Sequence, residues 1–580
     1  MGSLEKLGLR IRCVVRDPVL GTIPIYEHEY EVLQLPEVNR LHHLKQVGML
    51  YNVFPSAKHS RFEHSLGAMH IAGRIVETML CKLMERGEVA LRVAVSLLSE
   101  ACAEAARLRS KLKQCTSVND VRPELEALFS YVVLYERLAA LLHDVGHLAF
   151  GHSTEGLLEA LIEASPGDAE EFERLRRRGV KPHEYMAYKV VVTSEGLKEA
   201  IKRVGELPQL GLSPKPETVA SVILGEAVSP SVELSQAAIN VMHEVIGSDV
   251  DADRLDFVAR DAYMSGVPIS VDVDRLVEGF TLCVGEERGG RASVAIAHDV
   301  KSLAALEAFM LARVKMYELA YHHHKSVAYD VIVGEALAVI GRLGRIAGLC
   351  GVKDVSELAR ALTSGDVQLL TDYDFLRRLA AVAARVAGWE GEELRYYVKC
   401  LKDRRFLPMS IVKRRGEVPS LEPLMERLAP AGQASEAAIR EALTRIEGEL
   451  RARLNSRAVR EEVARKLSEA VGGADLSRVK VICKALRVST VGALGAPPLV
   501  EVSGKCRPLT ELSPAAASIS YSSAAPVLYA YLAYIDYRRP VIYEASLRAR
   551  GLKPALRSYL RGVMEDAISS MLSQGRSSAT

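Results

Sequence analysis

The sequence predicts a mainly α-helical protein with an N-terminal β-hairpin and a small C-terminal α+β module. Three observations support this fold class. Apolar residues recur at steps of three and four over most of residues 36–345, as they do on one face of a helix. Turn chemistry separates two apolar runs near the N-terminus. After residue 473 the period changes to that of short strands.

The composition is that of a globular protein. Of the 580 residues, 49% are hydrophobic and 26% are charged, which excludes a disordered or collagen-like chain. Lys and Arg number 75 against 73 Asp and Glu. The formal net charge of +2 therefore gives no reason to expect nucleic acid or an anionic membrane as a partner.

Three further features predict a cytoplasmic location. The first twelve residues contain no apolar segment of the secretory type, and no stretch of about 18 uncharged apolar residues occurs. The nine cysteines include no C-x-x-C pair. This scatter is typical of reduced thiols in a cytoplasmic protein.

The N-terminal part begins with an expected β-hairpin within residues 11–35, followed by a short extended segment. Asp17-Pro18-Val19-Leu20-Gly21 supplies the turn. Ser60-Arg61-Phe62-Glu63 matches the capping-box pattern, so a long buried helix is expected to begin there. Further helical segments are expected at about 86–125, at 124–144, from about 252, and at roughly 300–340.

A domain boundary is expected between residues 403 and 432, where four prolines interrupt the helical pattern of apolar residues. Beyond it we expect an amphipathic helix over 433–470 and strands at 479–483 and 499–502. Residues 527–534 fit either a third strand or the start of a helix. The last 40 residues have a helical pattern.

The most informative string is Leu142-His143-Asp144-Val145-Gly146-His147, with Gly151-His152 after it. It follows an apolar helix, so His143 and Asp144 are expected to be buried. Burying such groups costs free energy unless they are paired, and a divalent metal would satisfy both. A purely structural role is the alternative.

Two other positions complete a possible metal shell. His64 lies in the first turn of the capped helix, and Asp253 lies in a run that begins at Asp249. Two imidazoles and two carboxylates suit Zn, Fe or Mn. Taken singly, His64 is more often a core or surface histidine, and the aspartates could simply cap a helix N-terminus.

Several segments of the sequence, taken in chain order, resemble the motifs of the HD-domain phosphohydrolases. They are most similar to the motifs of the deoxynucleoside triphosphate triphosphohydrolase branch. The matching segments lie within residues 14–340 and are 17–21, 40–48, 54–67, 143–152 and 251–261. The segments 370–373 and 404–405 resemble later landmarks of that family. The resemblance implies an HD-domain helical bundle over residues 1–420, with a helical insertion at about 86–125 and a C-terminal α+β module over 421–580.

The resemblance also implies one metal ion bound by His64, His143, Asp144 and Asp253. His152 is the first candidate for proton transfer, and Glu155 could orient it through a hydrogen bond. His147 and His183 are further candidates for general acid or base.

The substrate implied by the resemblance is a nucleotide. Its phosphates would be bound by Arg61, Arg254 and Arg313, because Arg suits bidentate contacts to phosphate, and Mg²⁺ could accompany them. Gln46 and Asp261 match positions that hold the sugar 3′-hydroxyl, and Tyr321 matches the position that packs under the sugar. Two helical stripes are expected to face this pocket, one with Asp253, Phe257 and Asp261, the other with Arg313, Tyr317 and Tyr321.

The expected reaction is hydrolysis of deoxynucleoside triphosphates to nucleoside and triphosphate. Alternatives are another nucleotidase, a phosphodiesterase, an alarmone hydrolase, or a nucleotide-binding scaffold with a structural metal. Phe257 replaces a tyrosine that is frequent in the triphosphohydrolase branch. This difference weakens the prediction that deoxynucleoside triphosphates are the substrate. The resemblance further implies a homo-oligomer, a dimer or a tetramer.

Overall fold

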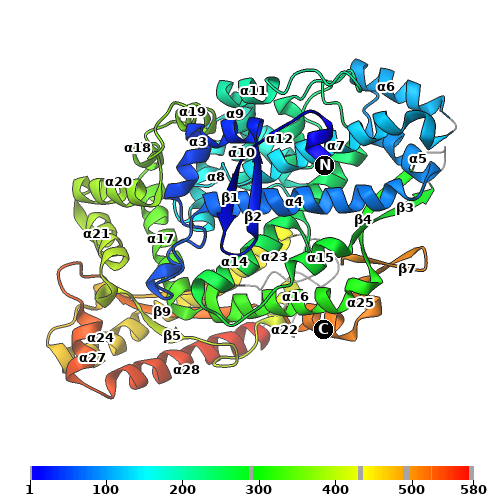
Figure 1. Ribbon diagram of the computed structural model, residues 1–580. Helices are drawn as coiled ribbons and strands as arrows, with labels where there is room; N and C mark the ends of the chain where they lie inside the picture. The colour runs from blue at the N-terminus through cyan, green and yellow to red at the C-terminus, as the bar shows by residue number, and fades with distance from the viewer. Residues whose placement is uncertain are drawn as a thin grey trace.

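Helices form most of the structure, a computed structural model that describes residues 3–115, 117–286, 292–428, 436–486, 497–523 and 526–573. At its centre the long helices α4 (Arg61–Met84) and α7 (Arg122–Leu142) pack against each other (Figure 1). Both helices are buried along most of their lengths. The predicted mainly α-helical fold is confirmed.

The other helices of the N-terminal part surround this pair. They are α1 (Ser3–Lys6), α2 (Glu27–Leu33), α3 (Pro36–Asn39), α5 (Glu88–Leu97), α6 (Ala103–Lys113), α8 (Glu155–Glu163), α9 (Pro166–Arg176), α10 (Pro182–Thr193), α11 (Glu195–Lys202), α12 (Pro216–Leu224), α13 (Gln236–Gly247), α14 (Ala252–Ser265), α15 (Val273–Gly279), α16 (Leu303–Met316), α17 (His324–Arg342), α18 (Ile346–Cys350), α19 (Val355–Leu362), α20 (Asp372–Arg385) and α21 (Gly388–Lys402).

Later helices lie mainly along the lower edge of Figure 1, where the chain is coloured yellow to red. They are α22 (Glu422–Leu428), α23 (Glu436–Leu454), α24 (Arg457–Val471), α25 (Leu509–Leu512), α26 (Pro514–Ser523), α27 (Val541–Arg548) and α28 (Leu552–Ser573). The short 3-10 helices are η1 (Arg40–His43), η2 (Leu50–Asn52), η3 (Val118–Val121), η4 (Gly151–Thr154), η5 (Val300–Ser302), η7 (Arg404–Phe406) and η8 (Leu476–Arg478).

The N-terminal hairpin is confirmed. Strands β1 (Ile11–Asp17) and β2 (Gly21–Tyr26) pair antiparallel. Asp17 stabilises the turn, because its Oδ1 accepts hydrogen bonds from the N–H groups of Val19 and Leu20, each at 2.8 Å. Gly21 has a φ of +80°, a conformation that glycine adopts without strain.

Two further sheets connect the N- and C-terminal parts of the chain. One has the order β3-β4-β7-β8, and its β7 pairs in parallel with β4. The other has the order β5-β9-β6, so residues 527–534 form its central strand rather than a helix. The strands are β3 (Phe280–Glu286), β4 (Ala292–Asp299), β5 (Met409–Val412), β6 (Val479–Leu486), β7 (Leu499–Val502), β8 (Lys505–Pro508) and β9 (Val527–Tyr534).

Three local predictions are wrong. The segment after the hairpin is helix α2, because Glu29 accepts a hydrogen bond from the Tyr26 N–H at 3.0 Å and so begins a helix. The expected helix over 300–340 is interrupted by a π-helical turn, η6 (Tyr317–Tyr321), before α17 begins. The expected helix over 433–470 is two helices separated at Asn455 and Ser456, and its residues 433–435 lie outside the described residues.

The prediction of reduced thiols is also wrong for one pair. Cys283 on β3 and Cys506 on β8 form a disulfide. The two residues are 223 positions apart in the sequence, so no local spacing could reveal the pair.

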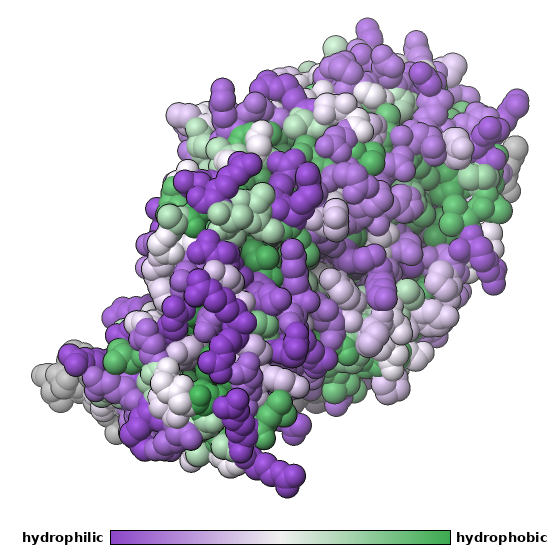
Figure 2. Space-filling view, turned by 90° about the vertical axis from the view of Figure 1, so that its left-hand side faces the viewer, coloured by the Kyte–Doolittle hydropathy of each residue, from purple (hydrophilic) through white to green (hydrophobic). Residues whose placement is uncertain are grey.

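The surface is predominantly hydrophilic on the face drawn in Figure 2, with small hydrophobic areas between polar side chains. Within the described ranges, none of the helices combines the length and the apolar character that crossing a membrane requires.

Candidate metal and nucleotide site

The four predicted metal ligands come together from three helices. His64 lies in the first turn of α4, Asp253 lies in the first turn of α14, and His143 and Asp144 directly follow α7. His64 Nε2 is 3.0 Å from Asp253 Oδ1 and 3.8 Å from Asp144 Oδ2. His143 Nε2 is 3.4 Å from Asp144 Oδ1 and 3.6 Å from Asp253 Oδ1. The predicted convergence of these side chains is therefore observed.

The nitrogen atoms of this cluster have the arrangement that a metal ion requires. Within the described residues, the buried Nε2 atoms of His64 and His143 make no hydrogen bond. Their Nδ1 atoms are hydrogen-bonded, that of His64 to Asp256 Oδ2 at 2.8 Å and that of His143 to the Ala140 carbonyl at 2.7 Å. An Nδ1–H that donates leaves the Nε2 lone pair available. The donor set therefore fits a divalent ion.

A buried ionic chain holds His64 in place. Asp256 accepts hydrogen bonds from Arg260 Nε at 2.9 Å and Nη2 at 2.7 Å, and Arg260 Nη1 contacts Asp17 Oδ2 at 2.7 Å. Burial would raise the pKa of Asp256, but Arg260 and His64 hold it below its usual value. The carboxylate therefore stays ionised beside the imidazole, and it links the hairpin turn to the metal cluster.

Two glycines allow neighbouring chain segments of the site to lie close to the backbone of α4 and of residue 146. A Cβ atom at Gly67 on α4 would lie 1.8 Å from Asp256 Oδ1. A Cβ atom at Gly146 would lie 2.1 Å from the carbonyl oxygen of His183. Any side chain at either position would displace the partners of the metal ligands or the neighbouring histidines.

Arg61 lies directly beside the metal cluster, as predicted for a phosphate-binding cation. Its Nη1 donates to Asp144 Oδ2 at 2.5 Å, and both side chains are buried. Burial alone would raise the pKa of Asp144, but Arg61 and His143 hold it well below its usual value. The carboxylate is thus kept in the ionised form that binds a cation.

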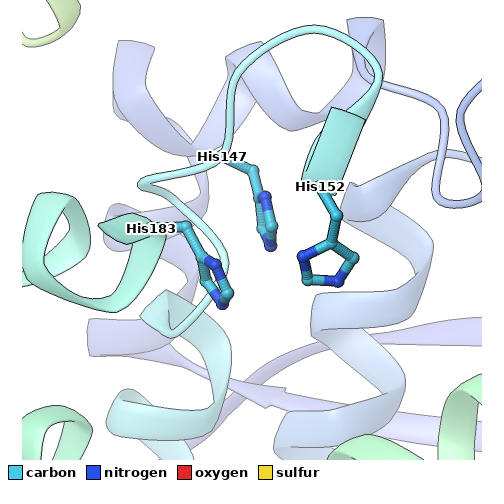
Figure 3. Close-up of side chains that lie close together, drawn as sticks. All are labelled: His147, His152 and His183. Atoms are coloured by element: carbon cyan, nitrogen blue, oxygen red, sulfur yellow. The ribbon is translucent and has the colours of Figure 1, made fainter. Parts of the chain in front are cut away.

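A second cluster contains the three histidines predicted for proton transfer. Figure 3 shows His147, His152 and His183 pointing toward one another. Glu155 Oε1 lies 2.8 Å from His152 Nδ1 and 2.7 Å from His183 Nδ1. Burial would raise the pKa of Glu155, but these two histidines hold it well below its usual value. One ionised carboxylate therefore orients both rings and leaves their Nε2 atoms for other partners.

The exposure of these rings differs. The side chain of His152 is 70% exposed, whereas His147 and His183 are buried. Burial, together with Arg61, lowers the pKa of His147 well below its usual value, so this ring is neutral. His152 is thus the one of the three that solvent reaches freely.

These three histidines are also close enough to hold a metal ion, since one nitrogen from each lies within 4.8 Å of the others. However, the rings of His147 and His183 are stacked, with centroids 3.9 Å apart and an interplanar angle of 17°. Lone pairs lie in the ring plane, so stacked rings direct them side by side rather than toward one point. This arrangement favours proton transfer over metal binding.

The predicted sugar-binding residues form a connected group. Tyr321 donates a hydrogen bond to Asp261 Oδ2 at 2.5 Å, and His59 Nε2 lies 2.6 Å from Asp261 Oδ1. The backbone N–H of Gln46 donates to the His59 carbonyl at 3.1 Å. Within the described residues, the buried Gln46 Oε1 has no hydrogen-bond partner. Tyr321 ends the π-helical turn, a feature frequent at functional sites.

The two remaining predicted cations lie near each other and near aspartates. Arg254 Nη1 contacts Asp251 Oδ2, and Arg313 Nη1 donates to the Asp249 carbonyl at 3.2 Å. Burial and the charge of Arg254 lower the pKa of Arg313. Tyr317 lies within electrostatic range of both guanidinium groups. Arg313 and Tyr317 of the second predicted stripe therefore lie near Arg254 of α14.

No protein-family model matches this chain. The chain is 25% identical over 284 residues to the deoxynucleoside triphosphate triphosphohydrolase SAMHD1 of Bos taurus, covering 47% of this chain and 38% of that protein. The enzyme of the same name from Mus musculus is 23% identical over 434 residues, covering 71% and 56% respectively. The chain spans about half the length of the curated relatives that it matches.

Solved structures share the fold. A hypothetical protein from Aquifex aeolicus has a TM-score of 0.51 and 19% identity, covering 93% of this chain and 100% of that one. A phosphohydrolase from Bacteroides thetaiotaomicron has a TM-score of 0.52 and 18% identity, covering 90% and 99%.

The chain is thus similar to deoxynucleoside triphosphate triphosphohydrolases along part of its length. This likeness confirms the resemblance stated from the motifs. Two features distinguish the chain from the pattern expected for the triphosphohydrolase branch of the HD-domain phosphohydrolases. Phe257 lies beside Tyr321, with ring centroids 6.3 Å apart, and offers no hydroxyl group. Helices α5 and α6 occupy the expected insertion at 86–125.

Two residues of the candidate site have no role in the sequence analysis. Asp256 lies three residues after Asp253 and so shares a helix face with it, a spacing that could have indicated it. His59 lies in the matching segment 54–67, but nothing in the local spacing indicates its contact with Asp261, 202 positions away.

Proposed function

We propose that this protein is a metal-dependent phosphohydrolase that acts on nucleotides and hydrolyses deoxynucleoside triphosphates to deoxynucleoside and triphosphate. The observation that carries the proposal is the direct contact between the two clusters. His147 Nε2 lies 3.3 Å from Asp144 Oδ1, so the proton-transfer histidines adjoin the metal ligands. The names of the relatives, which act on deoxynucleoside triphosphates, support the substrate class.

His64, His143, Asp144 and Asp253 would hold a divalent ion, with Zn, Fe or Mn suited to the donor set. The chemistry supplied by such an ion is Lewis-acid polarisation of a phosphoryl oxygen. The chain's own residues do the remaining work. Arg61, Arg254 and Arg313 bind the phosphate oxygens, a task for which their planar, multiply donating groups are suited.

His152 is the proposed proton donor to the leaving oxygen. Its Nδ1 is oriented by Glu155, and its exposed ring exchanges protons with solvent between turnovers. His147 and His183 flank it and keep its position. Imidazole is a side chain suited to general acid and base catalysis close to neutral pH.

The sugar would lie against Gln46, Asp261 and Tyr321. Gln46 Oε1, which has no hydrogen-bond partner within the described residues, and the carboxylate of Asp261 are suited to accept hydrogen bonds from the 3′-hydroxyl group. The ring of Tyr321 would pack under the sugar, where a 2′-hydroxyl would clash. We further propose that the protein is a cytoplasmic homo-oligomer, as the resemblance implies, and that Mg²⁺ accompanies the phosphates.

A second candidate is a nucleotidase or phosphodiesterase on the same frame. Phe257 favours it, because this side chain cannot donate the phosphate hydrogen bond expected of a tyrosine at that position. A scaffold with a structural metal is the third possibility.

A product assay separates these candidates. Metal-loaded protein is incubated with deoxynucleoside triphosphates, ribonucleoside triphosphates, monophosphates and cyclic nucleotides, and the phosphate product is identified. Inorganic triphosphate from the deoxynucleotides supports the proposal. Orthophosphate from monophosphates would move the function to the second candidate, and the absence of any product would favour the third.

A further inference from the structure

The segment that leads into α20 lies against the loop that carries the proton-transfer histidines. Leu370 in this segment and Phe150 in the loop have φ values of 51° and 58°. Large side chains rarely adopt this left-handed conformation, and it persists only where surrounding contacts hold it. The Ala149 N–H donates to the Leu370 carbonyl at 3.0 Å, so the two residues with left-handed backbone lie at one contact. We call this contact, between residues 147–150 and residues 369–372, the seam.

Asp372, at the start of α20, connects two separate segments of the site. Its Oδ1 accepts the backbone N–H of Phe150 at 2.9 Å, and its Oδ2 accepts the backbone N–H of Lys45 at 2.9 Å. Phe150 lies two residues before His152, and Lys45 directly precedes Gln46. One carboxylate thus joins the proposed proton donor's segment to the proposed sugar-binding segment.

Arg40 adds a second connection across the same seam. It is fully buried, its Nε donates to the Leu369 carbonyl at 2.8 Å, and its Nη2 donates to the His147 carbonyl at 2.7 Å. The ring of Phe150 also packs edge-on against Phe375 of α20, with centroids 5.7 Å apart. The loop is therefore held by its backbone as well as by its side chain.

We propose that Asp372 and Arg40 are positioning residues that set the separation of His152 from Gln46. Neither touches the proposed substrate. They act through the backbone of residues 45 and 147–150, and they hold Phe150 in its left-handed conformation. The roles of His152 and Gln46 rest on the proposed function, but the positioning itself does not.

The charge and shape of a carboxylate are essential to this role. Both oxygens of Asp372 accept hydrogen bonds, whereas an asparagine amide offers one accepting oxygen and one donating NH₂ group. In Asp372→Asn, the NH₂ group would face a backbone N–H, so one of the two segments is released. The helix cap is little affected, because the N-cap residue of α20 is Thr371.

Hydrogen exchange of the full chain tests the positioning without any substrate. In Asp372→Asn, we expect amide exchange in segment 44–48 or 145–153 to become at least tenfold faster, measured by mass spectrometry. Asp168→Asn is the matched control, because Asp168 is a buried carboxylate that accepts hydrogen bonds from Tyr185 and Lys189. The control should leave both segments unchanged. Unaltered protection of both segments in folded Asp372→Asn would overturn the proposal.

Steady-state kinetics with deoxynucleoside triphosphates then separates positioning from general stability. Asp372→Asn should lower kcat at least tenfold if the histidine segment is released, or raise KM if the segment of Gln46 is released, with metal content unchanged and a Tm no lower than that of Asp168→Asn. Arg40→Lys should lower kcat but leave KM within twofold, since the hydrogen bonds of Arg40 to the His147 and Leu369 carbonyls do not involve Lys45 or Gln46. If the wild type hydrolyses no nucleotide, the proposed function fails and the exchange experiment still decides the positioning. Wild-type kcat and KM in Asp372→Asn, in an active enzyme, would overturn it.

Discussion

The four predicted metal ligands lie on helices or directly beside them, whereas two of the three clustered histidines lie on a loop and a 3-10 turn. His64 and Asp253 are placed by the capped first turns of α4 and α14. His147 depends instead on Arg40, which donates to its carbonyl, whereas His152 depends on Glu155 and on the contact between Phe150 and Asp372 of α20. Groups on regular elements are held more precisely than groups on loops.

The difference suggests a division of labour within one site. Three of the four predicted metal ligands are buried and Asp253 is partly exposed, and secondary structure sets their geometry, so this cluster suits a task that requires fixed distances. The histidine cluster includes one ring with a 70% exposed side chain, so it suits a task that requires exchange with solvent. Variants that affect one cluster alone therefore test the comparison.

The largest effect is expected from Asp144→Ala, which removes a carboxylate shared by both clusters. Because Asp144 contacts Arg61, His143 and His147, its loss should abolish metal binding and nucleotide hydrolysis together. Metal content by elemental analysis and product formation are the measurements. Circular dichroism should remain largely helical, and unchanged activity would refute the site assignment.

His152→Ala should separate the two clusters. Loss of a proton donor typically lowers the rate by about 10²–10⁴-fold, so kcat should fall within that range. Metal content should stay at the wild-type level, because His152 lies outside the metal cluster. A variant that loses its metal as well would show that the two clusters are not independent.

Asp256→Asn should lower the metal affinity of the cluster, although Asp256 is not one of the four predicted ligands. The amide cannot hold the His64 Nδ1–H and Arg260 as the carboxylate does, and outer partners of this kind typically contribute about 10–100-fold in metal affinity. Metal affinity is measured by competition with a chelator. Asp168→Asn, which alters a buried and hydrogen-bonded carboxylate on α9, is the comparison, and equal losses in both variants would contradict a specific role for Asp256.

The smallest effect is expected from Glu184→Gln, at the start of the helix that carries His183. Burial would raise the pKa of Glu184, but Lys181 lowers it to about 2 from its usual 4.5. The glutamine oxygen can still accept the Lys181 N–H, but the charge that pairs with Lys181 Nζ at 3.1 Å is lost, which should cost about 1–2 kcal/mol of unfolding free energy at pH 7.

The sign of the pH dependence follows from that depressed pKa. The stabilisation by Glu184 is fully present above pH 4.5 and is lost as the pH falls toward 2. The difference between wild type and Glu184→Gln in urea unfolding should therefore shrink between pH 7 and pH 3. A difference that grows on acidification would disprove this assignment.

Much of the fold could be predicted because its signals are local. The capping box at Ser60 and the apolar period of α4 and α7 are visible in a few turns of sequence. The break after α16 could not be predicted, because the sequence Tyr317–Tyr321 contains no Pro or Gly to mark the π-helical turn. The membership of β7 in the sheet of β4 depends on a pairing about 200 residues away along the chain.

The site divides in the same way. The convergence of the four predicted metal ligands could be predicted from motifs whose residue types have few other uses together, whereas Asp372 lies in a segment that the sequence marks only as a landmark without a role. Its contacts are backbone hydrogen bonds to residues 222 and 327 positions away. Backbone groups carry no residue-type signal, so sequence patterns cannot reveal such contacts.

The parallel pairing of β7 with β4 has a consequence for how the chain could be divided. A fragment that stops at residue 428 would lack β7 and β8, and β4 would then present an unpaired strand edge. The same cut would leave Cys283 without Cys506. Open edges recruit strands from other molecules, so such a fragment should self-associate even if every residue of its catalytic pocket were intact.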